Sequence, residues 1–189
     1  MPKAEWVDLV DLNNQVVGRA LRSEVRSRNL LHRGIAVLVR NSQGQVYVHQ
    51  RTDCKDVFPS MYDMFVGGVV GSGEEYWPAA LREVREELGV ESERLKFLFD
   101  HLYHGPLNFS WVRCYEVVWD GPIQHQPEEV QWGQWLDADQ LDPWIERHEI
   151  VPDGLSVYQA YREFCQRPAL DINNYAAIIF DMDGILIDS

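Results

Sequence analysis

Apolar and polar residues alternate in several short segments of the chain, and this pattern predicts β-strands. Near the N-terminus, residues 6–11 and 15–20 flank Asn13 and Asn14, which favour a tight turn, so this region is expected to form a β-hairpin. Further strands are predicted at 34–39, 45–50, 62–66, 95–103, 109–119 and 131–136, with the first two paired across a turn at 41–44.

The strongest helical pattern covers residues 75–88. At 100° per residue one stripe is apolar and another is acidic; the apolar stripe holds Leu81, Val84 and Leu88, and the acidic stripe holds Glu83, Glu86 and Glu87. Pro78 is compatible with a first helical turn, and Gly89 suits the left-handed residue that ends a helix. Shorter helices are predicted at 23–28, after Asp137 as an N-terminal cap, and at 153–165.

Composition limits the classes of function. The 189 residues are 46% apolar, enough for the core of one domain, and 30 acidic against 17 basic side chains give a formal charge of −13. Such a charge opposes nonspecific binding to nucleic acid. The three cysteines are widely spaced, and the sequence shows neither an apolar leader nor an apolar run of membrane length. We therefore expect a soluble, cytoplasmic protein that binds neither nucleic acid nor membrane.

The acidic stripe of 75–88 predicts a metal site. Its three carboxylates repel one another, and two lie toward the helix C-terminus, where the helix dipole also disfavours negative charge. Hard oxygen ligands of this kind suit Mg²⁺ or Mn²⁺. A solvated surface with Arg82 paired to Glu86 is the alternative, but the glycine-rich segment 67–73 directly before the helix favours the metal.

These residues together resemble a known motif. The set Gly68, Glu74, Arg82, Glu83, Glu86, Glu87 and Gly89 is similar to the complete Nudix box. The resemblance implies an α/β fold, namely an α/β/α sandwich around a mixed β-sheet, here with the N-terminal hairpin added. It also implies a Nudix hydrolase that uses Mg²⁺ or Mn²⁺ to cleave a diphosphate linkage in a small molecule.

The same resemblance implies roles for individual residues. Glu83, Glu86 and Glu87 would hold metal together with the carbonyl of Gly67, Glu83 would also activate water, and Arg82 would orient Glu83. A further glutamate often follows later in such chains. Glu129 is the best match here, with Glu128 and Glu116 as rivals.

Residues 32–39 and 48–63 carry a second resemblance, to the Nudix branch that includes isopentenyl diphosphate isomerase. It implies that Arg51 and Lys55 bind the diphosphate, the alternative being two basic residues on a surface loop. It also leaves His32 near the site. The isomerase has a cysteine followed by Gly-His before the box, whereas 66–69 reads VGGV here, so hydrolysis is expected rather than isomerisation.

The last residues, 175–189, resemble the first motif of haloacid dehalogenase-type phosphatases, in which Asp181 and Asp183 would be the paired aspartates. The later motifs of such an enzyme are absent, so no phosphomonoesterase activity is expected. We therefore predict a Nudix domain at 1–168 and, at 169–189, the start of a truncated phosphatase-type domain after a linker at 168–174.

The function predicted from the sequence is hydrolysis of a nucleoside di- or triphosphate, or of a related nucleotide conjugate, by attack of water on phosphorus. Two alternatives stay open, an isomerase-like enzyme and a binding module that keeps the fold without turnover. The substrate itself is not specified, because residues outside the box select it.

Overall fold

A mixed β-sheet forms the centre of the molecule in the computed structural model, which describes residues 5–167, 180–182 and 185–187. Its middle strand is β3 (His32–Arg40), which pairs antiparallel with β6 (Phe65–Val69) and parallel with β8 (Phe109–Val118). β7 (Lys96–His104) adds antiparallel to the far side of β8. The mixed sheet expected from the sequence is confirmed.

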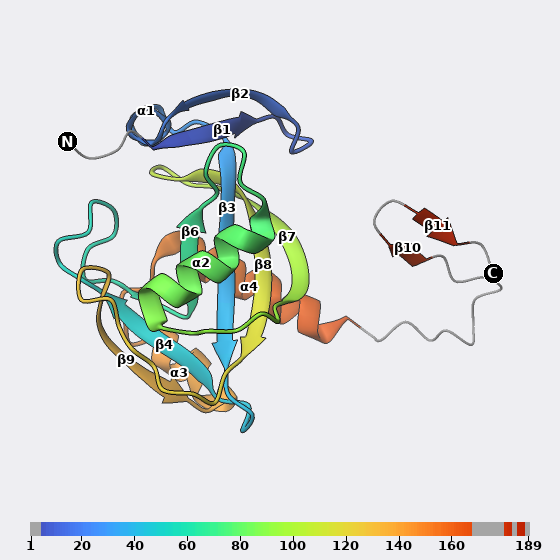
Figure 1. The fold of residues 1–189 in the computed structure, drawn as a ribbon. Helices are drawn as coiled ribbons and strands as arrows, with labels where there is room; N and C mark the ends of the chain where they lie inside the picture. The colour runs from blue at the N-terminus through green and yellow to red at the C-terminus, as the bar shows by residue number, and fades with distance from the viewer. Residues whose placement is uncertain (1–4, 168–179, 183–184, 188–189) are drawn as a thin grey trace.

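Helices cover both faces of this sheet, with α2 (Tyr76–Leu88) in front and α4 (Pro152–Gln166) behind in Figure 1. Successive side chains of β3 point alternately to the two faces of the sheet. Ile35, Val37 and Val39 belong to the cluster that includes Val84 and Leu88 of α2, whereas Ala36 and Leu38 pack with the cluster of α4. The α/β/α sandwich is therefore confirmed, and residues 34–39 of β3 carry no polar side chain because both faces of the strand are buried there.

The predicted pairing of strands 34–39 and 45–50 is much shorter than expected. β3 and β4 (Val46–Arg51) follow one another across a turn, but the register records only Arg40 opposite Val46. Both hydrogen-bonding edges of β3 are already taken by β6 and β8, so β4 diverges. It pairs instead with β5 (Tyr62–Asp63) and β9 (Val130–Leu136).

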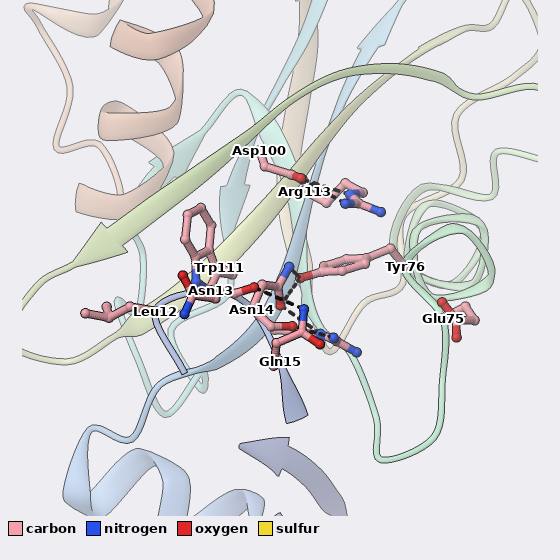
Figure 2. A pocket seen from close by; sticks show the side chains of 10 residues that line it. Leu12, Asn13, Asn14, Gln15, Glu75, Tyr76, Asp100, Trp111 and Arg113 are labelled. Carbon is pink, nitrogen blue, oxygen red and sulfur yellow. Dashed lines mark hydrogen bonds and ion pairs between the residues drawn. The ribbon is translucent and has the colours of Figure 1, made fainter. Parts of the chain in front are cut away.

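The N-terminal hairpin is confirmed as β1 (Trp6–Val10) and β2 (Val16–Leu21), followed by α1 (Arg22–Arg28). Its turn residue Asn14 has a positive φ of 60°, a conformation that asparagine tolerates. Arg33 donates to the Asn14 side chain at 2.9 Å and to its carbonyl at 2.8 Å, and Figure 2 shows Asn14 facing Tyr76 at hydrogen-bond distance. These contacts fasten the hairpin to the sheet and to α2.

A depression of about 560 Å³ lies beside this junction (Figure 2). Arg33, Asp100 and Arg113 in its lining already have partners. Arg113 bonds both carboxylate oxygens of Asp100 at 2.8 Å and lies 4.3 Å from the Tyr76 ring, and Arg33 is held by Asn14. Paired groups of this kind stabilise the contact between hairpin and sheet.

The capping role predicted for Asp137 is corrected by the structure. The segment opens as a 3₁₀ turn, η1 (Ala138–Gln140), before α3 (Leu141–Ile145), and the Asp137 side chain makes no cap hydrogen bond. Its carboxylate instead accepts a bond from the Gln45 side chain at 3.0 Å. The Asp137 carboxylate therefore bonds Gln45, which is distant in sequence, and does not cap the helix.

In the tail, β10 (Phe180–Met182) pairs antiparallel with β11 (Ile185–Ile187). The predicted linker at 168–174, and Asp183 and Gly184 of the phosphatase-type motif, lie outside the described residues. The division of the chain at residue 168 therefore stays a prediction. Among the described helices, none combines the length and the apolar composition that a membrane crossing requires.

Candidate active site

A cavity of about 340 Å³ opens between β6, the second half of α2, the loop after β4 and the start of α4. It gathers nearly all of the site residues predicted from the sequence. Its lining includes Arg51, Lys55, Gly67, Gly68, Arg82, Glu83, Glu86, Glu87 and Glu129. Residues spread over 79 positions of the chain (51 to 129) thus share one space, as a common site requires.

The glutamates reach the sheet because β6 has no side chains where α2 crosses it. A Cβ on Gly68 would lie 2.4 Å from both Cγ and Cδ of Glu83. At the other end of the helix, Gly89 has a φ of +66° and its N–H donates to the carbonyl of Arg85 at 3.0 Å. Gly68 therefore admits Glu83, and Gly89 ends the helix directly after the acidic turn.

Arg82 organises the carboxylates around it. Its Nε and one terminal nitrogen each lie 3.1 Å from an oxygen of Glu74, and its other terminal nitrogen lies 2.7 Å from Glu83 and 3.4 Å from Glu86. Glu74 also accepts from the N–H of Gly71 at 2.9 Å, which closes the glycine loop. The rigid guanidinium fork thus links the loop to the acidic face of α2.

Two of the glutamates are held in a setting that disfavours their charge. Burial raises the pKa of Glu83, although Arg82 opposes the shift. Burial, followed by the charge of neighbouring Glu83, raises the pKa of Glu87 to about 7. Crowded buried carboxylates of this kind would be relieved by a bound cation.

The donor set fits Mg²⁺ or Mn²⁺ by its chemistry, since it consists of hard carboxylate oxygens and the carbonyl of Gly67. Within the described part of the chain, however, no three acidic, histidine or cysteine side chains converge closely enough to enclose a metal ion. Mg²⁺ is usually held by one or two carboxylates, with water and substrate phosphates completing the shell. An incomplete protein shell is compatible with that mode of binding.

Basic side chains line the same cavity as these glutamates. Lys55 forms an ion pair with Glu129, and burial together with the charge of Arg51 lowers the pKa of Lys55. Arg51 donates to the carbonyls of Phe58 and Val57 at 3.2 and 3.1 Å, so it also shapes the loop that carries Lys55. Both residues lie on the cavity wall and could meet phosphate oxygens.

The three candidates for the late glutamate are separated by the fold. Glu129 lines the cavity, whereas Glu128 is exposed and Glu116 pairs with Arg40 at 3.0 Å on β8. His32 also lines the cavity, where it is buried and its Nδ1 lies 2.9 Å from the carbonyl of Leu30. Burial lowers the pKa of His32, which therefore favours a neutral ring.

Sequence reasoning missed several polar residues on the wall of this cavity, among them Asp63, Asn108, Ser110 and Asp153. For two of them a signal existed. Asp63 interrupts the apolar run 61–66, and Ser110 lies on the buried face of β8 together with Val112 and Cys114. A polar side chain at an otherwise buried strand position calls for a partner or a function.

Comparison with known proteins identifies the family of this chain. The NUDIX domain family model matches residues 30–160. An uncharacterized Nudix hydrolase of Streptomyces coelicolor is 48% identical over 160 residues, covering 84% of this chain and 88% of that protein. A crystal structure of DR0079 from Deinococcus radiodurans superposes with a TM-score of 0.71 at 32% identity, covering 86% of this chain and 100% of the other.

A more distant structure shares the fold alone. The NUDIX domain of Shewanella oneidensis NrtR, solved in complex with ADP ribose, has a TM-score of 0.54 at 18% identity, covering 72% of this chain and 88% of that chain. The family model spans most of the domain, and the Streptomyces relative is well above the identity at which membership is secure. The chain belongs to the Nudix hydrolase family, whose members act on pyrophosphate bonds.

Proposed function

We propose that this protein is a metal-dependent hydrolase that cleaves the diphosphate linkage of a nucleoside di- or triphosphate or a related nucleotide conjugate. The observation that carries the proposal is that acidic and basic side chains line the same cavity. Glu83, Glu86 and Glu87 share this lining with Arg51 and Lys55, and the charges of Lys55 and Arg51 oppose the raised pKa of Glu87. A phosphate chain bound between them would meet cationic side chains directly and carboxylates through a cation.

The residues proposed to hold Mg²⁺ or Mn²⁺ are Glu83, Glu86 and Glu87, with the carbonyl of Gly67. When bound, such an ion neutralises charge on the phosphate oxygens and makes water more acidic. Glu83 is the proposed acceptor of the proton from the attacking water. Its pKa is raised and is therefore closer to neutral pH than the pKa of an exposed glutamate, which favours a general base. Arg82 holds the Glu83 carboxylate in place.

Phosphate recognition is proposed for Arg51 and Lys55. Arg51 is already anchored by two loop carbonyls, so little freedom is lost when it meets a phosphate oxygen. Lys55 would exchange its ion pair with Glu129 for the substrate, which frees the Glu129 carboxylate inside the same cavity. Glu129 is therefore proposed as an accessory carboxylate of the reaction.

The binding of ADP ribose by the NrtR domain supports a nucleotide-derived substrate for this fold. Isomerase chemistry has less support, because neither Cys54, which is exposed, nor Cys114, which is buried, lines the cavity. The stretch 66–69, which corresponds to the isomerase's Cys-Gly-His, reads VGGV and holds neither a cysteine nor a histidine.

Hydrolysis of a nucleotide panel with Mg²⁺ or Mn²⁺ tests the proposal, with release of phosphate or nucleoside monophosphate as the readout. Glu86→Gln should lower turnover by about 100-fold or more, the usual cost of losing a group essential to catalysis. Glu75→Gln is the matched control, since Glu75 is an exposed glutamate at the start of the same helix and outside the cavity. Full activity of Glu86→Gln would refute the metal assignment, and no turnover of any nucleotide by the wild type would favour a binding module.

A further inference from the structure

The cavity reaches both faces of the sheet at the strand β6. Gly68 pairs with Ile35 of β3, and the Glu83 side chain of α2 covers Gly68 on the α2 face of the sheet. Gly34 and Ser110 belong to the opposite face, because Gly34 shares the side of Ala36 on β3 and Ser110 the side of Val112 on β8, and both of these residues pack with the cluster of α4. Glu83 and Ser110 both line the cavity although they lie on different faces of the sheet.

Ser110 is a buried polar group that lacks a partner. Its side chain belongs to a residue that is 1% exposed, and its hydroxyl has no hydrogen-bond partner among the described residues. Buried hydroxyls are nearly always bonded, because they lose water on burial. Since Ser110 lines the cavity, a ligand in the cavity can supply the missing partner.

Asp63 adds a second buried polar side chain to the same lining. One of its oxygens, Oδ1, accepts from the N–H groups of Met64 and Phe65 at 2.8 and 3.0 Å, and Oδ2 makes no hydrogen bond to the described residues. Burial, followed by the charge of Asp153, raises the pKa of Asp63 to about 8. At neutral pH its carboxyl is therefore mostly protonated and can donate a hydrogen bond.

Asp153 completes this polar wall as an acceptor. Its Oδ2 accepts from the Asn108 side chain at 2.6 Å and its Oδ1 from the N–H of Gly154 at 3.1 Å. These bonds hold the carboxylate at the start of α4, with Gly154 packed directly on Asp63. The wall thus offers a hydroxyl, a neutral acid and a carboxylate, whereas a hydrocarbon ligand would leave the Ser110 hydroxyl without a partner.

We propose that Ser110, Asp63 and Asp153 form a hydrogen-bonding subsite for the part of the substrate that is not phosphate, and that this part is a polar group no larger than one nucleoside. The cavity volume of about 340 Å³ is near the lower limit for small-molecule sites, which excludes a second nucleoside from the space. The subsite rests on the proposed function, which places the diphosphate at the glutamates.

Binding of nucleoside 5′-monophosphates in the presence of Mg²⁺, measured by titration calorimetry, tests the subsite without any anhydride bond to cleave. AMP, GMP, CMP and UMP are compared with isopentenyl monophosphate, which carries the same phosphate on a hydrocarbon. At least one nucleotide should bind about ten-fold tighter than isopentenyl monophosphate, because hydrogen bonds that satisfy buried groups favour the polar ligand.

Ser110→Ala should weaken binding of that nucleotide by about five- to ten-fold, the effect of losing one hydrogen bond, and leave isopentenyl monophosphate unchanged. Ser156→Ala is the matched control, because it removes a serine hydroxyl that bonds His101 outside the cavity. Gly34→Ala gives a second measure, since its methyl would occupy space beside Ser110 and should weaken nucleotide binding as well.

Tighter binding of isopentenyl monophosphate, lack of binding by all four nucleotides, or unchanged affinity in both Ser110→Ala and Gly34→Ala would overturn the subsite. Failure of the proposed hydrolysis looks different. In that case the nucleotide would still bind in a Ser110-dependent manner, while nucleoside di- and triphosphates would not be cleaved.

Discussion

The Glu83 side chain fills the space that a side chain at Gly68 would need, since a Cβ on Gly68 would lie 2.4 Å from the Cδ of Glu83. The absence of a side chain on β6 therefore determines where the buried carboxylate of α2 can lie. This dependence joins a strand residue to a helix residue fifteen positions later.

Gly68→Ala should displace Glu83 and lower kcat/KM for nucleotide hydrolysis by about 100-fold, because a misplaced carboxylate loses its alignment with water. The protein should still fold, since Glu83 is a side chain that can move. Gly18→Ala is the control, because a Cβ there meets nothing within 4 Å. Activity of Gly68→Ala equal to that of Gly18→Ala would show that the position of Glu83 is not critical.

Arg82→Lys should lower kcat/KM by about 10- to 100-fold, the usual cost of removing a group that orients a metal ligand. A lysine ammonium cannot reproduce the bonds that the fork makes to Glu74 and Glu83 at once. Steady-state kinetics checks this, with Arg85→Lys on the same helix as the matched change. If Arg82→Lys retained wild-type kinetics, a point charge would suffice and the orienting role would be lost.

Glu129→Gln should lower kcat/KM by about ten-fold or more, because its carboxylate is proposed to serve the reaction, whereas Glu128→Gln and Glu116→Gln should stay within about two-fold, because both lie outside the cavity. The reason is position, because among these three only Glu129 lines the cavity. The three variants are compared under identical metal and substrate concentrations. A larger loss in Glu128→Gln or Glu116→Gln would transfer the role to that residue.

Asp63 should make the protein less stable as pH rises. Its pKa is raised from the ordinary 3.8 to about 8, so between these values the folded chain keeps a proton that the unfolded chain releases. The folded state then binds more protons, and the free energy of unfolding falls across this window and levels above about pH 8.

Asp63→Asn cannot ionise, so the decline in thermal midpoint between pH 5 and pH 8.5 should be smaller than in the wild type by about 5 °C. Thermal unfolding followed by circular dichroism measures the difference. Asp53→Asn, a change at an exposed aspartate, should retain the wild-type slope. Equal slopes in the wild type and Asp63→Asn would contradict a buried, protonated Asp63.

Local sequence predicted the parts of this protein that depend on neighbours in the chain. The hairpin turn at Asn14 and the helix that Gly89 ends follow from backbone preferences and from apolar spacing within a few residues. The cluster of glutamates also needed only helical geometry, since three and four residues make one turn. These features therefore appeared where the pattern placed them.

Long-range pairing decided the rest. The limited contact of β3 with β4 depends on β6 and β8 competing for the same edges, and Asp137 serves Gln45 rather than a helix end. The pairing of Lys55 with Glu129 joins loops far apart in sequence. The polar wall around Ser110 is of the same kind, because burial and the loss of partners arise only when α4 covers the sheet.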